Sequence, residues 1–370
     1  MINFENRLKS LKDRRQGTRE RVLLDNNLSI IKSIDVRTKE NYEELSESAP
    51  IKYVIGAMAA VDSRSTQISI DEGERVADTL INMLGTSGTS AEREIQGSVA
   101  LNIHIEGHSD VDMLILKSDI VLVRTPKIDG SACIAHDNRP MVDIIRELRQ
   151  QSEAKLTSRY YQADVDCTGN KSIALSGGSL KRKVDIVPGC WYHSHDYQRT
   201  RAKHHKGVEI YHKGDHKLIS NQPFLHIKLV NDKDTLYSGN LKKVVRLMKN
   251  LIADMPDYKK RVAKNLSSYD VTAIGYDMNE ELYCPSYLPL TLVEKLRAHL
   301  SLLVVSPELR NLTLVPDGSR KVFDSEEKVE ALVILHSEVT DLAKSIYKSL
   351  NPYGLDAYNS HQLLQKEIFI

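Results

Sequence analysis

The sequence predicts an α+β protein with two lobes, a mixed β-sheet core lobe and a C-terminal helical lobe. The chain has 370 residues, 41% of them hydrophobic, which is enough for two domain cores. Residues 95 to about 230 hold short segments with the composition of strands, whereas the flanking regions repeat apolar residues at helical spacing. We therefore expect N-terminal helices that pack on both lobes (1–94), a core domain (95–235) and a helical domain (236–370).

The individual elements follow from local patterns along the chain. Apolar stripes at 53–61 and 74–84 indicate N-terminal helices, and GTSGTS at 85–90 ends the second of them. A helix at 141–151 interrupts the β-rich region. The predicted β segments are 95–116, 118–125, 181–188, 207–212 and 223–230. The predicted C-terminal helices are 241–255, followed by Pro256, then 291–304, and 325–350 with Ser325 as N-cap.

The composition excludes several classes of protein. Lys and Arg number 51 and Asp and Glu 50, so the net charge of +1 gives no general attraction to nucleic acid or to an anionic membrane. The four cysteines are scattered without a CxxC pair, which argues against a disulfide framework or a cysteine-rich zinc site. No run approaches about 18 apolar residues, and the first residues lack an apolar leader. We expect a cytoplasmic protein without a membrane segment.

Two aspartates interrupt an apolar strand at the end of the stretch IQGSVALNIHIEGHSDVDMLIL. Because side chains alternate along a strand, Asp110 and Asp112 face the same way, while Val111 and Met113 face the core. A third aspartate, Asp185, lies between two apolar residues in KRKVDIVP. Carboxylates gathered on adjacent strands repel one another, and a divalent cation is the usual remedy. The pattern favours a site of hard oxygen ligands for Mg²⁺ or Mn²⁺.

A Gly-Ser pair lies upstream of these aspartates. Gly97 allows the backbone to approach a phosphate closely, and Ser98 can donate a hydrogen bond to it. An isolated DxD is more often a solvated strand edge or a turn, and a Gly-Ser pair alone carries no signal. Together with a later strand aspartate, however, the order favours phosphoryl transfer with two metal ions.

At this point the chain resembles a known family. The order IQGSVALNIHI, SDVDMLIL, VDIVP is similar to that of the polymerase-β-type nucleotidyltransferase superfamily, in particular the branch of the bacterial cGAS/DncV-like nucleotidyltransferases (CD-NTases) and animal cyclic GMP-AMP synthase. The resemblance implies a bilobed polymerase-β-like fold with its catalytic core in 95–235. One departure is Asn102-Ile103, where many bacterial members have a Gly-Thr pair.

The resemblance also implies roles for the residues of the motif. Gly97 and Ser98 correspond to the pair that contacts the phosphates of the donor nucleotide. Asp110 and Asp112 correspond to the acids that bridge two Mg²⁺ ions, for which Mn²⁺ is an alternative. Asp185 corresponds to the third acid, which also helps to activate the attacking ribose hydroxyl.

The helical lobe extends the resemblance. Apolar residues form a stripe along 241–255 and leave Lys249 and Asn250 off it, a pattern that a solvated basic face also explains. RLMKNL and the following LSSYDVTAI resemble the segment that closes over the nucleotide in cyclic GMP-AMP synthase and its relatives. The resemblance implies Lys249 and Ser268 on the triphosphate tail and Tyr269 stacked on a base. From pattern alone, Tyr269 is more often a core residue.

One further segment, 190–205, gathers histidines and basic residues. Its Cys and His spacing matches no ordinary structural zinc site, so zinc is the weaker interpretation. The stronger one is a basic segment beside the nucleotide cleft, where Arg199, Arg201 and Lys203 meet phosphates or the acceptor.

These features together predict a Mg²⁺-dependent synthase of a cyclic di- or trinucleotide second messenger, made from NTPs with release of pyrophosphate. The resemblance implies ATP, GTP or both as substrates, a monomeric enzyme, and a separate effector protein that responds to the product in anti-phage signalling. One alternative is a nucleotidyltransferase that acts on tRNA or on a protein. Another is an inactive nucleotide-binding module, against which the three retained aspartates argue. The bases joined, the ring size and the linkage stay open.

Overall fold

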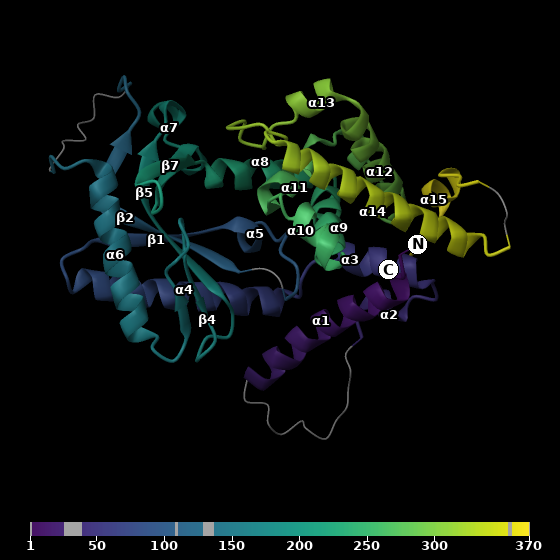
Figure 1. Ribbon diagram of the computed structural model, residues 1–370, viewed down its shortest axis with the longest axis horizontal. Coiled ribbons are helices and arrows are strands. Elements are labelled where there is room, and N and C mark those ends of the chain that lie inside the picture. The colour runs from purple at the N-terminus through teal and green to yellow at the C-terminus, as the bar shows by residue number, and fades with distance from the viewer. Residues whose placement is uncertain (1, 26–38, 108–109, 129–136, 354–356, 370) are drawn as a thin grey trace. The chain divides into compact units, whose positions relative to one another are not determined.

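The computed structural model describes residues 2–25, 39–107, 110–128, 137–353 and 357–369, with the backbone alone for 16–25. It contains two compact units (Figure 1). A helical unit comprises Met1–Val61, Ile103–His108 and Val230–Ile370, and a sheet unit comprises Asp62–Asn102 and Ser109–Leu229. The predicted α+β class, with a mixed sheet and a C-terminal helical domain, is confirmed.

The sheet unit is built on a mixed sheet that has seven strands in the described residues. Its central pair, β2 and β5, is parallel, and the other neighbouring strands are antiparallel. The order is β1-β2-β5-β4-β3, and β6 pairs with the later part of β5 and with β7. The strands are β1 (Ala91–Gln96), β2 (Val111–Val123), β3 (Asp164–Asp166), β4 (Ile173–Ser176), β5 (Val184–His193), β6 (Lys206–His212) and β7 (Lys217–Asn221).

Two long helices, α4 (Ser63–Gly85) and α6 (Met141–Arg159), pack against the sheet (Figure 1). The carboxylate of Asp62 caps α4 by accepting from two backbone N–H groups. Buried residues at helical spacing, including Val76, Leu80 and Leu84, face the sheet and join β2 and β5 in one core. A Cβ at Gly73 would lie 2.6 Å from Val111 Cγ1, so a residue without a side chain lets α4 approach the first residue of β2.

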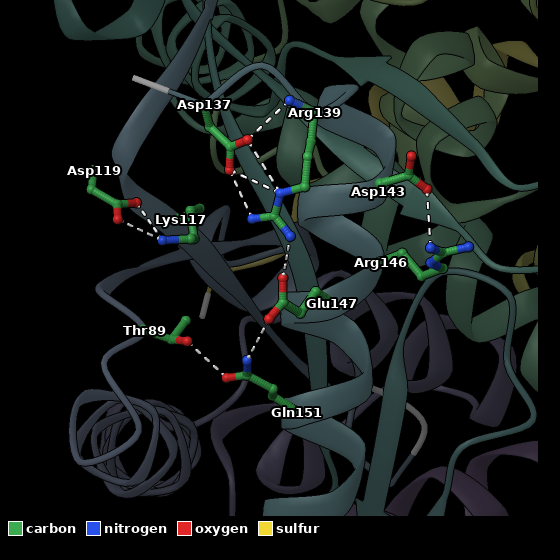
Figure 2. Close-up of polar contacts among 9 residues, drawn as sticks. All are labelled: Thr89, Lys117, Asp119, Asp137, Arg139, Asp143, Arg146, Glu147 and Gln151. Atoms are coloured by element: carbon green, nitrogen blue, oxygen red, sulfur yellow. Dashed lines mark hydrogen bonds and ion pairs between the residues drawn. The ribbon is translucent and has the colours of Figure 1, made fainter. Parts of the chain in front are cut away.

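The exposed side of α6 carries a polar network (Figure 2). Arg139 pairs with Asp137 at 2.7 Å and with Glu147 at 2.9 Å. Gln151 donates to Glu147 and accepts from Thr89, which stands before β1. These exposed contacts tie neighbouring segments to α6, and each contributes little to stability because water screens it.

The helical unit surrounds α3 (Ala49–Met58), which is buried on almost all sides. Helices α1 (Phe4–Asp25), α9 (Asn240–Ala253) and α14 (Glu326–Leu350) all pack against it. Side chains of α9 donate hydrogen bonds to the last carbonyl groups of α3. Arg246 Nε donates to Met58 O at 2.8 Å and Asn250 Nδ2 to Ala57 O at 3.0 Å. The remaining helices of the unit are α2 (Asn41–Glu44), α10 (Asp257–Ala263), α11 (Ser268–Asp277), α12 (Leu290–Val305), α13 (Pro307–Leu312) and α15 (His361–Gln365).

Most predicted elements are confirmed, and two differ. The segment 223–230, predicted as a strand, belongs to helix α8 (Pro223–Leu236). Its buried residues are Pro223, His226 and Val230, which are three and four apart, and proline favours the first turn of a helix. The stretch 95–116 is not one strand either, because the short helix α5 (Gly97–Ala100) follows β1 and a loop precedes β2.

Two further predictions concern domains and membranes. Of the N-terminal helices, α1 to α3 belong to the helical unit and α4 to the sheet unit, and the division at residues 94 and 235 stays a prediction. Among the helices that the structure describes, none combines the length and the apolar character needed to cross a bilayer.

Candidate active site

The first residues of the two parallel central strands bring two of the predicted aspartates together. Asp112 is the second residue of β2, Asp185 the second residue of β5, and the register pairs them directly. On its other side Asp112 is paired with Gln96, the last residue of β1. Since neighbouring strands lie about 4.8 Å apart, these two carboxylates leave the same side of the sheet as near neighbours. Asp110 stands just before β2.

The two faces of β2 are both packed farther along the strand. As predicted, Val111, Met113 and Ile115 belong to the core beneath α4 and α6. Leu114, which shares the face of Asp112, lies in a second buried cluster with Trp191 of β5. Packed apolar neighbours on both faces hold the start of the strand in one position, so the register of its aspartates is well defined.

The electrostatics of the site are those of carboxylates that are partly buried close to one another. Burial raises the pKa of Asp110, and the charge of Lys183 opposes this. The pKa of Asp185 is also raised, first by burial and then by the negative charge of Asp110. A hydrogen bond that Ser172 Oγ donates to Asp185 Oδ2 at 3.1 Å lowers this pKa, as Lys183 does. The site therefore concentrates negative charge that a cation would stabilise.

The carboxylates of Asp110, Asp112 and Asp185 are of a kind that binds divalent metal ions. Three carboxylates are the hard oxygen ligands that Mg²⁺ and Mn²⁺ prefer, and the register and the raised pKa values agree with a shared cation. Across the described ranges, no three His, Cys, Asp or Glu side chains converge into a closed metal cluster. The residues thus fit the ions in type and in order along the strands.

Gly97 lies directly after β1 and close to the carboxylate of Asp112. It begins α5 directly after β1, with a φ of +77°, and a Cβ there would overlap Oδ2 of Asp112. Both the backbone angle and the space therefore require glycine. Ser98 follows as the second residue of α5 and is half-buried. The predicted Gly-Ser pair and the aspartates thus meet at one end of the sheet.

The other three predicted residues lie in the helical unit. Lys249 is half-buried on α9, and Ser268 is the exposed first residue of α11, a helix that packs on α9. Ser267 and Asp270 form a capping box that starts α11 at this point. Tyr269 is half-buried, and its hydroxyl donates to Asp317 Oδ2 at 3.1 Å. Burial, followed by the charge of Asp317, raises the pKa of Tyr269, so the phenol stays protonated.

Sequence reasoning missed some residues near the aspartates and misplaced another. Lys183, whose charge acts on Asp110 and Asp185, is two residues before Asp185, a strand spacing that was a usable signal. Ser172 arrives through the antiparallel β4–β5 pairing, which no local pattern announced. Asn250, expected off the apolar stripe, is instead buried and bonded to Ala57 O.

The basic segment 190–205 forms the end of β5, helix α7 (His195–Thr200) and a 3-10 turn (Lys203–His205). Lys206, just after it, lies 4.4 Å from the centroid of the Trp191 ring. Burial, followed by the charge of Lys206, lowers the pKa of His193 to about 4. This segment is fully described, and no metal cluster is found in it.

The fold and the site define a class: a mixed sheet that aligns two aspartates beside a Gly-Ser turn, followed by a helical domain, is a nucleotidyltransferase architecture. Comparison with known proteins agrees. Residues 228–334 match the model of the cGAS/DncV-like nucleotidyltransferase C-terminal helical domain. A cyclic dinucleotide synthase CdnE from Yersinia aleksiciae is 32% identical over 369 residues, covering 96% of this chain and 95% of the relative. The chain belongs to the cGAS/DncV-like nucleotidyltransferase family, in its CdnE branch.

Two more comparisons are informative. A c-di-GMP synthase from Capnocytophaga granulosa is 30% identical, covering 82% of this chain and 88% of the relative. The solved structure of a STING-associated CdnE c-di-GMP synthase from the same species has a TM-score of 0.69 at 26% identity, covering 93% of this chain and 99% of that one. The prediction of a nucleotidyltransferase similar to cyclic dinucleotide synthases is confirmed, and such enzymes are typically metal-dependent.

Proposed function

We propose that this protein makes cyclic di-GMP from two molecules of GTP, releasing one pyrophosphate for each phosphodiester bond. The observation that carries the proposal is similarity along most of the chain: 32% identity to a cyclic dinucleotide synthase over 96% of it, and 31% and 30% to two c-di-GMP synthases over 78% and 82%. The site supports it, since aligned strand carboxylates beside a Gly-Ser turn suit nucleotidyl transfer.

In this proposal the chain binds and orients the two nucleotides and balances the negative charge of their phosphates. The backbone at Gly97 and the hydroxyl of Ser98 bind the donor phosphates. Asp110, Asp112 and Asp185 would hold two Mg²⁺ ions, or Mn²⁺, whose bound charge favours deprotonation of the attacking hydroxyl and departure of pyrophosphate. Asp185 orients the attacking ribose hydroxyl and assists loss of its proton.

The helical unit supplies the other three residues of this proposal. Lys249 and Ser268 bind the triphosphate tail, and Tyr269, held by Asp317, offers its ring to a base. In each round the hydroxyl oxygen bonds to the α-phosphorus as the bond to the β-phosphate oxygen breaks, and the second round closes the ring.

The biological setting follows from the same relatives. One structural relative is STING-associated, so we propose that the product activates a separate effector protein in anti-phage defence. The enzyme would act in the cytoplasm as a monomer.

The proposal is tested by incubating the protein with labelled GTP, ATP or both in Mg²⁺, followed by phosphatase and mass spectrometry. Cyclic di-GMP from GTP alone is expected. A product that requires a second nucleobase contradicts the assignment of GTP, and label that appears in added tRNA or protein supports the other acceptor class. Asp112→Asn should abolish the product, while Asp119→Asn, exposed on the same strand, should not.

A further inference from the structure

A small pocket lies within the sheet unit, and none of the predicted active-site residues lines it. Its volume is about 130 Å³. Arg75 of α4, Arg159 at the end of α6, and the following Tyr160 and Gln162 line it together with Ser179 of the β4–β5 loop. Three segments far apart in the sequence thus contribute polar side chains to one enclosure.

The pocket carries positive charge. Arg159 is exposed and forms no ion pair within the described part of the chain. Arg75 bonds Glu72 through Nε and Nη2, at 3.3 and 2.7 Å, which leaves Nη1 available to another acceptor. Both guanidinium groups lie 5.9 Å from the centroid of the Tyr160 ring, so this ring holds two cations at the same pocket.

Tyr160 itself has an unused hydrogen-bonding group. The residue is 6% exposed, and its hydroxyl is buried without a partner among the described residues. A buried hydroxyl without a hydrogen bond is costly, and folded proteins rarely leave one unpaired. Because Tyr160 also lines the pocket, a small shift of its side chain would let this hydroxyl donate to an acceptor oxygen bound there.

We propose that this pocket binds a tetrahedral oxyanion, either free phosphate or the phosphate group of a small phosphomonoester. Two guanidinium groups and a phenol donor match the charge and the acceptors of a phosphate. The volume suits one such group, and it is well below the roughly 300 Å³ at which pockets for whole small molecules begin.

The pocket is connected to the aspartates through backbone. Glu72 Oε1, which holds Arg75, also accepts from Lys181 N at 3.2 Å. Two residues farther along is Lys183, whose charge acts on Asp110 and Asp185. An anion that competes with Glu72 for Arg75 frees the Glu72 carboxylate to move. The hydrogen bond from Lys181 N to this carboxylate then changes, and with it the loop that leads to Lys183. Occupancy of the pocket therefore modulates synthesis, a consequence that rests on the proposed function.

The binding is tested on the full-length protein by titrating inorganic phosphate at constant ionic strength and following Tm, because a ligand that binds the folded state raises it. Arg159→Gln and Tyr160→Phe should each weaken the apparent phosphate affinity about tenfold. Arg146→Gln is the matched control: it lies on the same helix, in the exposed ion pair with Asp143 drawn in Figure 2, and should bind as the wild type does. Equal affinity in all four proteins would overturn the site.

Two further arms separate the source of the anion and its effect. Glycerol phosphate in place of phosphate shows whether a monoester is accepted, and tighter binding of the monoester identifies it as the ligand class. The rate of dinucleotide formation should change about fivefold with phosphate in the wild type and in Arg146→Gln, and not in Arg159→Gln. The same response in all three contradicts the coupling. Failure to form any dinucleotide contradicts the proposed function instead. The Tm titration would still test phosphate binding, because it does not depend on activity.

Discussion

Acidic residues occupy two very different settings in this protein. In the helical unit, Glu338 is fully buried and bonded to two cations, Arg7 and Lys259, at 2.5 and 2.8 Å. In the sheet unit, Asp110 and Asp185 lie near each other, with raised pKa values and Lys183 as the cation that acts on both. The paired acid stabilises the fold, whereas the crowded acids destabilise the metal-free chain and keep oxygen ligands ready for a cation.

The largest effect is expected at the crowded acids. Asp110→Asn should lower product formation about 10³-fold or more, because a ligand of the proposed ions is lost. It should leave the free energy of unfolding equal or slightly higher, because repulsion with Asp185 is removed. Product assays and urea denaturation measure the two quantities. Asp119→Asn is the control, and an active Asp110→Asn would mean that this residue is no ligand.

The paired acid should behave in the opposite way. Glu338→Ala leaves Arg7 and Lys259 without their buried partner and should lower the free energy of unfolding by about 3–5 kcal/mol. The activity of each folded molecule should persist. Urea denaturation checks the loss against Glu330→Ala, an exposed position on the same helix. A loss no larger than in that control would mean that these pairs contribute nothing to stability.

Gly97 links the two kinds of effect. Gly97→Ala should lower product formation about 100-fold, because the new Cβ displaces the Asp112 carboxylate. The strained φ should also destabilise the fold by about 1–2 kcal/mol. Gly177→Ala is the control, since its φ of +73° is similar and nothing lies within 4 Å of its Cβ. An equal loss of product formation in both variants would show that backbone strain alone, and not displacement of the Asp112 carboxylate, causes the loss.

The crowded acids should also give the metal-free protein a specific pH dependence. Their pKa values are raised in the folded state above the ordinary 3.8, so the folded chain holds protons more tightly than the unfolded chain. Their contribution therefore lowers stability as the pH rises from about 3.8 through the raised values. Urea denaturation in EDTA at several pH values should show a flatter dependence in this window for Asp110→Asn than for Asp119→Asn. Identical slopes would argue against crowding.

The smallest effect is expected at Ser172. Ser172→Ala removes a hydrogen bond that lowers the pKa of Asp185, so that pKa should rise further. The acidic limb of the pH profile for product formation should move to higher pH, with a change worth about 1 kcal/mol. Ser176→Ala, on the adjoining strand β4, should leave the limb in place. If the acidic limb does not move in Ser172→Ala, Asp185 is not the group whose titration produces it.

Features that depend on neighbours along the chain could be predicted before the structure. Strand alternation put Val111 and Met113 in the core, and helical spacing identified the stripe of α9. The Gly-Ser pair and the three aspartates were recognisable because their order along the chain resembles that of a known family, and the family is confirmed by similarity along the chain.

Features that depend on distant residues could not be predicted and were seen only in the folded chain. It turned 223–230 into a helix, buried Asn250 against the end of α3, and aligned Gln96, Asp112 and Asp185 across three strands. It also assembled the Tyr160 pocket from three separated segments. The physical reason is that local periodicity reports which face a residue occupies, whereas register, burial of polar groups and pockets arise from long-range packing.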